Sequence, residues 1–496
     1  MNRSAIPRRL LFTSCLLFGS AFILPPSAFS QGSLTPPGAP GPTMKRLDEI
    51  EPRINLQATP PPAGVDTADT NYHFIITQPG SYYLSANLVV SRTNGILIKT
   101  EGVTIDLRGF KISRSGVTTG GDAIQVSPSS HRASVRDGSI RGFAYGVESL
   151  AAAGSGNLVR GSAFRNLAVS GCTSAGIMAG DSAVLESCRV IDTDTGGAGS
   201  GIVSGAQSTL VNCMVTFITG VDGISVGRGS SLSHCTASKV TGTHAIMAGD
   251  GSSLSNCSAY DNAATGIYAN HGCVLHNCSS HNNTGDFGIF AGIGSSLTNC
   301  SAYLNTVGFG ISANFGSTLT HCSAVSNTST AAGSGGILTG GACTVTHCSS
   351  YSNNSTAGTS TASTGQGFNL DSGSTIQNCT AYSNQGDGIR VNIGCTVRQN
   401  NCRFNGNIFD GAGIHSTNTD NRIEGNNVTN STRGIDVDST GSFIVKNSVS
   451  GSTTNYEIAA NNKVGTIVSA PNSVAISGST GGAGVGSTDP WANVSY

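Results

Sequence analysis

Apolar positions recur along this chain in two series, each with an interval of about 22 residues. The first is usually an isoleucine that follows glycine, and the second is a cysteine within variants of Gly-Ser-x-Leu-x-Asn-Cys-Ser-Ala-Tyr. The isoleucine series comprises Ile177, Ile202, Ile224, Ile246, Ile267, Ile289, Ile311, Ile337, Phe368, Ile389, Ile414 and Ile435, and the cysteine series comprises Cys188, Cys213, Cys235, Cys257, Cys278, Cys300, Cys322, Cys348, Cys379 and Cys402. Self-similarity at a fixed period predicts a repeat architecture.

One repeat, Gly266–Phe287, contains three short segments of alternating apolar and polar residues, separated by turns rich in asparagine and glycine. A period of two predicts strands, and the lack of a 3.6-residue period excludes an α-helical solenoid. Weaker copies occur at Ile96, Ile124 and Val147, with Ile458 as a candidate last copy. We therefore expect an all-β chain: a single-stranded right-handed parallel β-helix (β-solenoid) of about 15 rungs with N- and C-terminal caps.

The same alternation predicts which way each column faces. It places the isoleucine and cysteine series inside, and the first and third residues after each isoleucine outside. In-register parallel cysteines point the same way, which favours a ladder of free thiols over disulfides, although bridges stay open for an exported chain. The residue before each cysteine is mostly asparagine or histidine, which tolerate the left-handed conformation, so His234, His321 and His347 are interpreted as turn residues.

The two ends of the chain carry different signals. Residues 1–30 are predicted to be a signal peptide, because arginines precede the apolar run Leu10–Leu24 and Ala28-Phe29-Ser30 offers a cleavage site. We expect a Pro-rich tether and N-terminal cap over 31–70, the β-helix over 71–465 and a C-terminal tail or cap over 466–496, with Trp491 as the plug. The protein is expected to be secreted, periplasmic or on the cell surface.

Composition removes several classes of function. A net charge of −1 with 11% charged residues lacks the basic profile of a nucleic-acid binder, and no later stretch is long and apolar enough to span a membrane. We expect no nucleic-acid partner and no membrane span, and a homo-oligomer stays open.

Several segments carry a family resemblance. They are Gly373–Asn384 and Gly386–Val391 among the rungs, with the opening segments Pro79–Leu84 and Val103–Leu107. Together they resemble secreted bacterial right-handed parallel β-helix repeat proteins of the pectate-lyase-like superfamily, over roughly residues 70–465. The resemblance implies the fold and a link to carbohydrate, since that superfamily is rich in polysaccharide lyases and hydrolases alongside adhesins. Its catalytic motifs are not matched, so no active site carries over.

The most informative place is where the outward columns change character. Over the middle rungs the first outward column is largely apolar, whereas four later rungs carry charged and amide residues within about 15 Å. The candidate catalytic residues are Asp371, Arg390, His415, Asp436 and Asp438, and the candidate substrate-binding residues are Tyr268, Phe290, Asn369 and Asn392.

Carboxylates with arginine and histidine can perform general acid–base work on a sugar chain. They can also hold Ca²⁺ through Asp oxygens, although no cofactor is expected, no metal ligands are assigned, and a solvated polar face is the alternative. The apolar stripe has three interpretations: cover by the N-terminal segment, contact with a second copy, or sugar stacking.

Three functions follow from these patterns. The first is an exported β-helix protein that binds extracellular or cell-wall polysaccharide along an exterior sheet, without catalysis. The second is a polysaccharide lyase or glycoside hydrolase, which requires that Asp371, Arg390 and Asp436 share an open groove. The third is a structural or adhesive surface protein.

Overall fold

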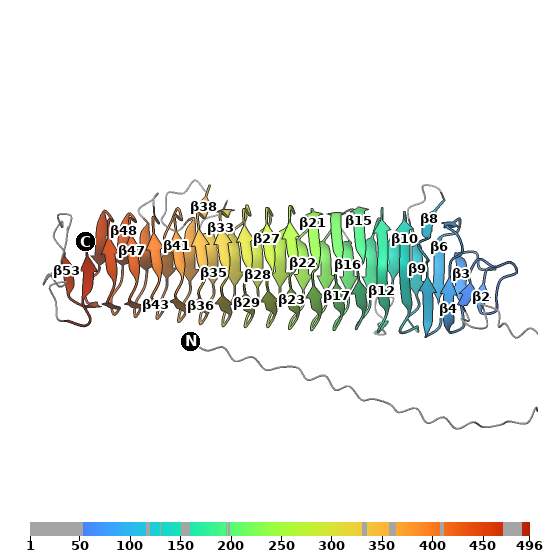
Figure 1. The fold of residues 1–496 in the computed structure, drawn as a ribbon, viewed down its shortest axis with the longest axis horizontal. Coiled ribbons are helices and arrows are strands. Elements are labelled where there is room, and N and C mark those ends of the chain that lie inside the picture. Colours follow the sequence, from blue (N-terminus) through green and yellow to red (C-terminus); the bar gives the residue numbers. More distant parts are fainter. Residues whose placement is uncertain are drawn as a thin grey trace, which may run out of the picture. The chain divides into compact units, whose positions relative to one another are not determined.

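Short strands stacked in parallel make up the regular structure of this protein (Figure 1). The computed structural model describes residues 53–115, 120–128, 130–149, 159–194, 196, 199–329, 335–356, 364–406, 411–469 and 489–496. Among these residues there is no helix. The predicted signal peptide and the part of the tether before residue 53 lie outside the described residues.

Each turn of the chain contributes one strand to each of three parallel ladders. The first ladder consists of β3 Tyr72–Ile76, β6 Asn94–Ile98, β9 Asp122–Val126, β11 Tyr145–Glu148, β13 Ala175–Ala179, β16 Ser200–Ser204, β19 Asp222–Val226, β22 His244–Ala248, β25 Thr265–Ala269, β28 Phe287–Ala291, β31 Phe309–Ala313, β35 Gly335–Thr339, β39 Gln366–Leu370, β42 Ile389–Val391, β45 Ala412–Ser416, β48 Arg433–Val437 and β51 Thr454–Ile458. These strands pair in chain order and in parallel, so the repeat is a β-helix of about 17 turns.

The second ladder follows the first within each turn. It consists of β4 Gly80–Tyr83, β7 Val103–Asp106, the first halves of β10 Ser134–Arg141 and β12 Ala163–Ser170, β14 Val184–Glu186, β17 Thr209–Val211, β20 Ser231–Ser233, β23 Ser253–Ser255, β26 Val274–His276, β29 Ser296–Thr298, β32 Thr318–Thr320, β36 Thr344–Thr346, β40 Thr375–Gln377, β43 Thr396–Arg398, β46 Arg422–Glu424, β49 Phe443–Val445 and β52 Lys463–Val464.

The third ladder closes each turn. It consists of β5 Leu88–Val90, β8 Lys111–Arg114, the second halves of β10 and β12, β15 Arg189–Asp194, β18 Met214–Thr219, β21 Thr236–Val240, β24 Ser258–Tyr260, β27 Ser279–His281, β30 Ser301–Tyr303, β33 Ser323–Val325, β37 Ser349–Tyr351, β41 Thr380–Tyr382, β44 Asn401–Arg403, β47 Asn427–Thr429, β50 Ser448–Ser450 and β54 Asn493–Ser495.

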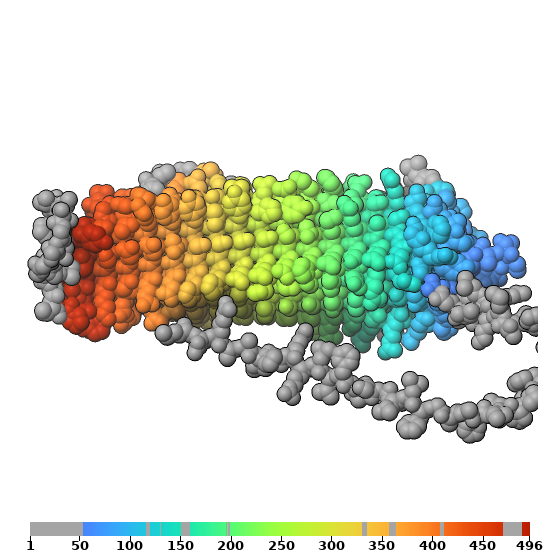
Figure 2. Space-filling view, viewed as in Figure 1, coloured from blue at the N-terminus to red at the C-terminus, as the bar shows by residue number. Residues whose placement is uncertain are grey.

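A few strands lie outside this scheme. β1 Arg53–Asn55 extends the second ladder beyond β4, and β2 Val65–Asp66 pairs antiparallel with β3. β34 Thr328–Ser329 pairs with β38 Asn354–Ser355, and β53 Ile467–Ser469 pairs with β54. In the space-filling view the colours follow the sequence along the β-helix, so neighbouring turns form neighbouring bands of its surface (Figure 2).

The all-β parallel β-helix expected from the sequence is confirmed, with slightly more turns than the 15 predicted. The first turn, at Phe74, and the last turn, where Tyr456 and not Ile458 aligns with Ile435, both lack the Gly-Ile signature. Both side chains nevertheless occupy the isoleucine column, because Phe74 pairs in register with Ile96 and Tyr456 with Ile435.

Glycine and isoleucine of each Gly-Ile pair both face the interior, which breaks strict alternation. A Cβ on Gly388 would lie 2.6 Å from the Gly413 carbonyl oxygen and 2.7 Å from Asn405 Nδ2, so only glycine fits there. The residue two positions before each isoleucine is therefore turned outward. A third outward column results, and the alternation rule does not anticipate it.

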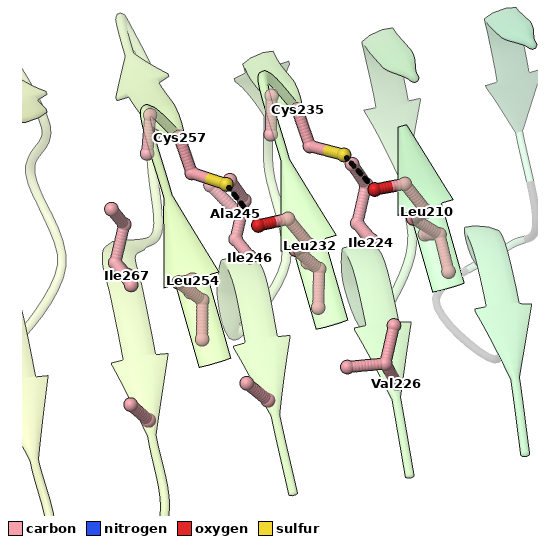
Figure 3. Packing of buried hydrophobic residues seen from close by; sticks show 14 of the residues in the cluster. Leu210, Ile224, Val226, Leu232, Cys235, Ala245, Ile246, Leu254, Cys257 and Ile267 are labelled. Carbon is pink, nitrogen blue, oxygen red and sulfur yellow. Dashed lines mark hydrogen bonds between the residues drawn. The ribbon is translucent and has the colours of Figure 1, made fainter. Parts of the chain in front are cut away.

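Nine cysteines, Cys188 to Cys379 in the predicted series, form a buried internal ladder. All of these thiols except that of Cys348 donate to carbonyl oxygens of the preceding turn. For example, Cys235 Sγ lies 3.6 Å from Leu210 O, and Cys257 Sγ lies 3.7 Å from Leu232 O (Figure 3). Cys402 is the exception, because it lies in register with Ala381 of the neighbouring column. Asn400 occupies the position after Cys379 in this ladder, and its Oδ1 accepts a hydrogen bond from the Cys379 backbone amide.

Buried asparagines form two further internal ladders in which each amide bonds to the next. One runs through Asn262, Asn283, Asn305, Asn327, Asn353, Asn384 and Asn405. The other runs from Asn400 through Asn426 and Asn447 to Asn493 of β54. Asn493 is fully buried whereas Trp491 is 45% exposed, so the C-terminal segment covers the last turn through its asparagine and not through tryptophan.

Candidate functional site

A pocket of about 620 Å³ opens on the outer face of the first ladder. β28, β31, β35, β39 and β42 form it, together with the residues that follow them and with Thr417 after β45. The lining residues are Phe287, Phe290, Ser312, Ala313, Asn314, Leu338, Thr339, Gly340, Asn369, Leu370, Asp371, Arg390, Val391, Asn392 and Thr417. One end is therefore aromatic and the other polar.

The aromatic end terminates a stack of rings along the first outward column. The ring centroids of Tyr268 and Phe290 lie 4.6 Å apart, and the angle between the two ring planes is 14°. Because this distance is close to the spacing of about 4.8 Å between turns, the ring faces are directed along the β-helix axis. The His244 ring covers the far side of Tyr268 at 4.5 Å. The next residue after Phe290 in the column is the small Ser312, so one face of Phe290 borders the pocket.

Beyond the polar end lies a cluster of charged side chains around His415. Its Nδ1 is 2.9 Å from Asp387 Oδ2 and its Nε2 is 2.9 Å from Asp438 Oδ2. Asp436 Oδ2 lies 3.5 Å from Nε2 and 2.7 Å from the Arg433 guanidinium. Arg390, which lines the pocket, donates to Asp387 at 3.3 Å and so connects pocket and cluster.

Burial sets the electrostatics of this cluster. Asp387 is fully buried, Asp436 is 1% exposed and His415 is 6% exposed, while the Asp438 side chain is half exposed. Burial raises the pKa of Asp436 to about 6, against the opposing effect of His415 and Arg433. Burial by itself lowers the pKa of His415, but Asp387, Asp436 and Asp438 together outweigh it and hold that pKa above its usual value.

The structure separates the residues that the sequence grouped together. Phe290, Asn369, Asp371, Arg390 and Asn392 line the pocket. The remaining candidates, Tyr268, His415, Asp436 and Asp438, do not. The groove that the catalytic hypothesis requires for Asp371, Arg390 and Asp436 is therefore not formed as predicted, because Asp436 is buried beside His415 and Arg433.

Asp371 belongs to a separate network at the polar end of the pocket. Its Oδ1 accepts hydrogen bonds from Asn392 Nδ2 at 2.8 Å and from the Ser372 amide at 2.7 Å. These bonds lower the pKa of Asp371. This carboxylate is thus held ionised and positioned to accept a hydrogen bond from a bound hydroxyl group.

Two members of the charged cluster were not predicted from the sequence. Asp387 and Arg433 lie two residues before Ile389 and Ile435, in the third outward column. A usable signal was present: an acidic and a basic residue three apart across a Gly-Ile pair, as in Asp387/Arg390 and Arg433/Asp436. Alternation alone assigns these positions to the wrong face.

His415, Asp436 and Asp438 each have one potential metal-ligand atom, and these three atoms lie within 4.8 Å of one another. A nitrogen and two carboxylates are suitable donors for a divalent transition metal. However, the Arg433 guanidinium already neutralises Asp436 at 2.7 Å. A cation would have to compete with Arg433 for the Asp436 carboxylate.

The raised pKa of Asp436 predicts a pH-dependent stability. The unfolded group ionises near 3.8 and the folded one near 6, so its contribution is fully present below pH 3.8 and is lost as the pH rises through 6. Asp436→Asn cannot ionise, so its free energy of unfolding relative to wild type is expected to increase by up to about 3 kcal/mol between pH 4 and pH 8. Chemical denaturation at both pH values measures this difference, and an unchanged difference would contradict the assignment.

Comparisons with known proteins are consistent with the observed fold. The family model described as "Right handed beta helix region" matches residues 200–350 and 330–454. No curated protein matches the sequence. In the part of the chain that the structure describes, no helix could cross a membrane.

Similar solved structures share little sequence with this chain. The mannuronan C-5 epimerase AlgE4 A-module of Azotobacter vinelandii is 14% identical, with a TM-score of 0.34 over 73% of this chain and 90% of that one. The catalytic domain of a GH87 α-1,3-glucanase in complex with nigerose is 11% identical, with a TM-score of 0.26 over 63% and 61%. The Dettilon tailspike protein is 13% identical, with a TM-score of 0.30 over 72% and 58%.

Proposed function

The chain belongs to the family of right-handed β-helix regions, and from this premise we propose that it is an exported protein that binds extracellular or cell-wall polysaccharide along the first ladder, without catalysis. The observation that carries the proposal is the pocket, with a free aromatic face at one end and oriented polar groups at the other. This combination of an apolar surface and a few fixed polar groups is typical of small-molecule and saccharide sites.

The aromatic end is suited to one sugar unit. The faces of Tyr268 are covered by His244 and Phe290, so only Phe290 has a face left for a ligand. The apolar C–H face of a pyranose ring packs well on such a surface, where it is removed from water. The ring centroids of Phe287 and Phe290 lie 5.1 Å apart, and Phe287 forms a side wall of the pocket.

The polar end supplies direction and specificity. Asp371 offers a carboxylate acceptor, Asn369 and Asn392 offer amides, and Arg390 offers guanidinium donors. Hydroxyl groups can both donate and accept, so they match such a mixed set. The chain of a glycan would then run along the β-helix axis, from Phe290 toward Arg390.

Phe290→Ala is expected to weaken polysaccharide binding about 10- to 100-fold, since burial of a phenylalanine side chain is worth about 1.5–3 kcal/mol. Isothermal titration of a panel of neutral and acidic polysaccharides identifies the ligand, and the same titration then compares the variants. Met247→Ala is the matched control, because Met247 lies in the same column two turns away and does not line the pocket.

The control also separates the competing functions. If both variants bind like wild type, the pocket is not the glycan site. If neither polysaccharide binding nor a Phe290 effect is found but the protein associates with itself, the structural or adhesive alternative replaces this proposal.

One observation favours a second candidate function, cleavage of a polysaccharide at His415 instead of in the groove that the sequence predicted. His415 is held between a fully buried carboxylate, Asp387, and a half-exposed one, Asp438. An imidazole oriented by a buried carboxylate is a common arrangement for proton transfer. In this alternative His415 moves the proton, Asp438 faces the substrate and Asp387 is a positioning residue.

A further inference from the structure

The internal thiols bear on how the protein reaches its destination. All fourteen cysteines outside residues 1–30 are buried and unbridged. In the main ladder, every thiol except that of Cys348 donates to a backbone carbonyl one turn back, and the thiols of Cys235 and Cys257 point the same way (Figure 3). A disulfide needs side chains that approach each other with a dihedral angle near 90°. Side chains that point the same way from in-register parallel strands are poorly placed for that dihedral angle, and the structure leaves these thiols unbridged.

Burial shields the thiols of the folded state from reagents. It also raises the pKa of Cys172 to about 12 and raises that of Cys402, which suppresses the reactive thiolate at these two positions. An unfolded chain has no such protection. Its fourteen exposed thiols would exchange freely in an oxidising compartment, and any bridge formed there would block the stacking of turns.

A second, independent observation lies in the leader. Arg8 and Arg9 are adjacent and are followed at once by the apolar residues Leu10, Leu11 and Phe12. Paired arginines before the apolar segment are the mark of a twin-arginine signal. Such signals direct export of proteins that have already folded.

From these two observations we infer that the chain folds with its thiols reduced before export, and that Arg8 and Arg9 address it to an exporter of folded proteins. The inference rests on the exported location within the proposed function and is independent of glycan binding. The partner is thus a receptor that reads the arginine pair on a chain whose β-helix is already complete.

The test uses the full chain expressed in a bacterium that has both the twin-arginine and the general secretion routes. The paired variant Arg8→Lys with Arg9→Lys is expected to abolish export and to leave folded protein inside the cell. Arg3→Lys is the matched control, because it changes another leader arginine outside the pair and is expected to be exported like wild type. Normal export of the paired variant, or no export of wild type, would overturn the inference.

Thiol counting provides the second readout. Exported wild type is expected to show fourteen reactive thiols after denaturation and none before it. A chain whose leader is replaced by a general secretory signal is expected to be disulfide-linked and protease-sensitive, and to recover its thiols in a host that lacks the disulfide oxidase. If the leader-swapped chain is fully reduced and protease-resistant in the oxidising host, prior folding is unnecessary and the inference fails. Glycan binding of refolded protein is measured separately, so the two proposals fail independently.

Discussion

Asn305→Ala is expected to lower the free energy of unfolding by at least about 3 kcal/mol, because it leaves several buried polar groups without partners at about 1–3 kcal/mol each. Asn305 Nδ2 donates to Ser280 O and to Asn327 Oδ1, both at 3.0 Å. Its Oδ1 accepts from the backbone amide and the side chain of Asn283 at 3.0 and 2.9 Å. The side chain is fully buried, so water cannot replace these bonds.

Asn401→Ala is the control for this effect. Asn401 is an exposed, outward residue of β44, and its replacement is expected to change stability by less than about 0.5 kcal/mol. Guanidinium denaturation followed by far-ultraviolet circular dichroism compares the two midpoints. Equal shifts in both variants would mean that the asparagine ladder contributes nothing beyond local propensity.

His415→Ala is expected to reduce polysaccharide cleavage by about 10²- to 10⁴-fold if the second candidate function holds, which is the range for removal of a general acid or base. Binding at Phe290 should persist, since His415 does not line the pocket. Assays for reducing ends and for unsaturated products, on the polysaccharide that binds, measure the loss.

Asp387→Asn distinguishes positioning from general structural support. The Asp387 carboxylate raises the pKa of His415, so its removal is expected to move the His415 limb of the pH–rate profile to lower pH. His244→Ala is the control: this histidine pairs with Asp222 at 2.8 Å on the same ladder but lies several turns away, and its loss should leave the rate unchanged. If wild type yields no product from any bound polysaccharide, the catalytic alternative is discarded and binding stands.

Much of the candidate site was accessible from the sequence because register is strict in a parallel β-helix. Asn369, Arg390, His415 and Asp436 follow the isoleucine column by one residue, and the structure pairs them turn upon turn. Equivalent positions on adjacent strands are forced to neighbour each other once one face is buried. The column itself was therefore predicted correctly.

The subdivision of that column could not be predicted. Phe290, Asn369 and Arg390 line a pocket, whereas His415 and Asp436 are buried in an ion-pair cluster on the same face. The difference arises from Asp387 and Arg433, which reach the outer face only because Gly388 and Gly434 turn inward. Likewise, the sequence around Cys402 matches that of the thiol ladder, but Asn400 occupies the ladder position next to Cys379, and Cys402 aligns with Ala381.

The sequence by itself determined the fold of this protein, the stacking of its turns and the column on which its chemistry lies, because a repeated period leaves one in-register way to bury the apolar residues. Only the tertiary structure decided which outward residues are open to a ligand and which are paired and buried. The exposure of an outward residue depends on the size and charge of the side chains on neighbouring strands and turns. Phe290 has a free ring face because its neighbour in the column is the small Ser312, whereas Asp436 is covered and paired by Arg433.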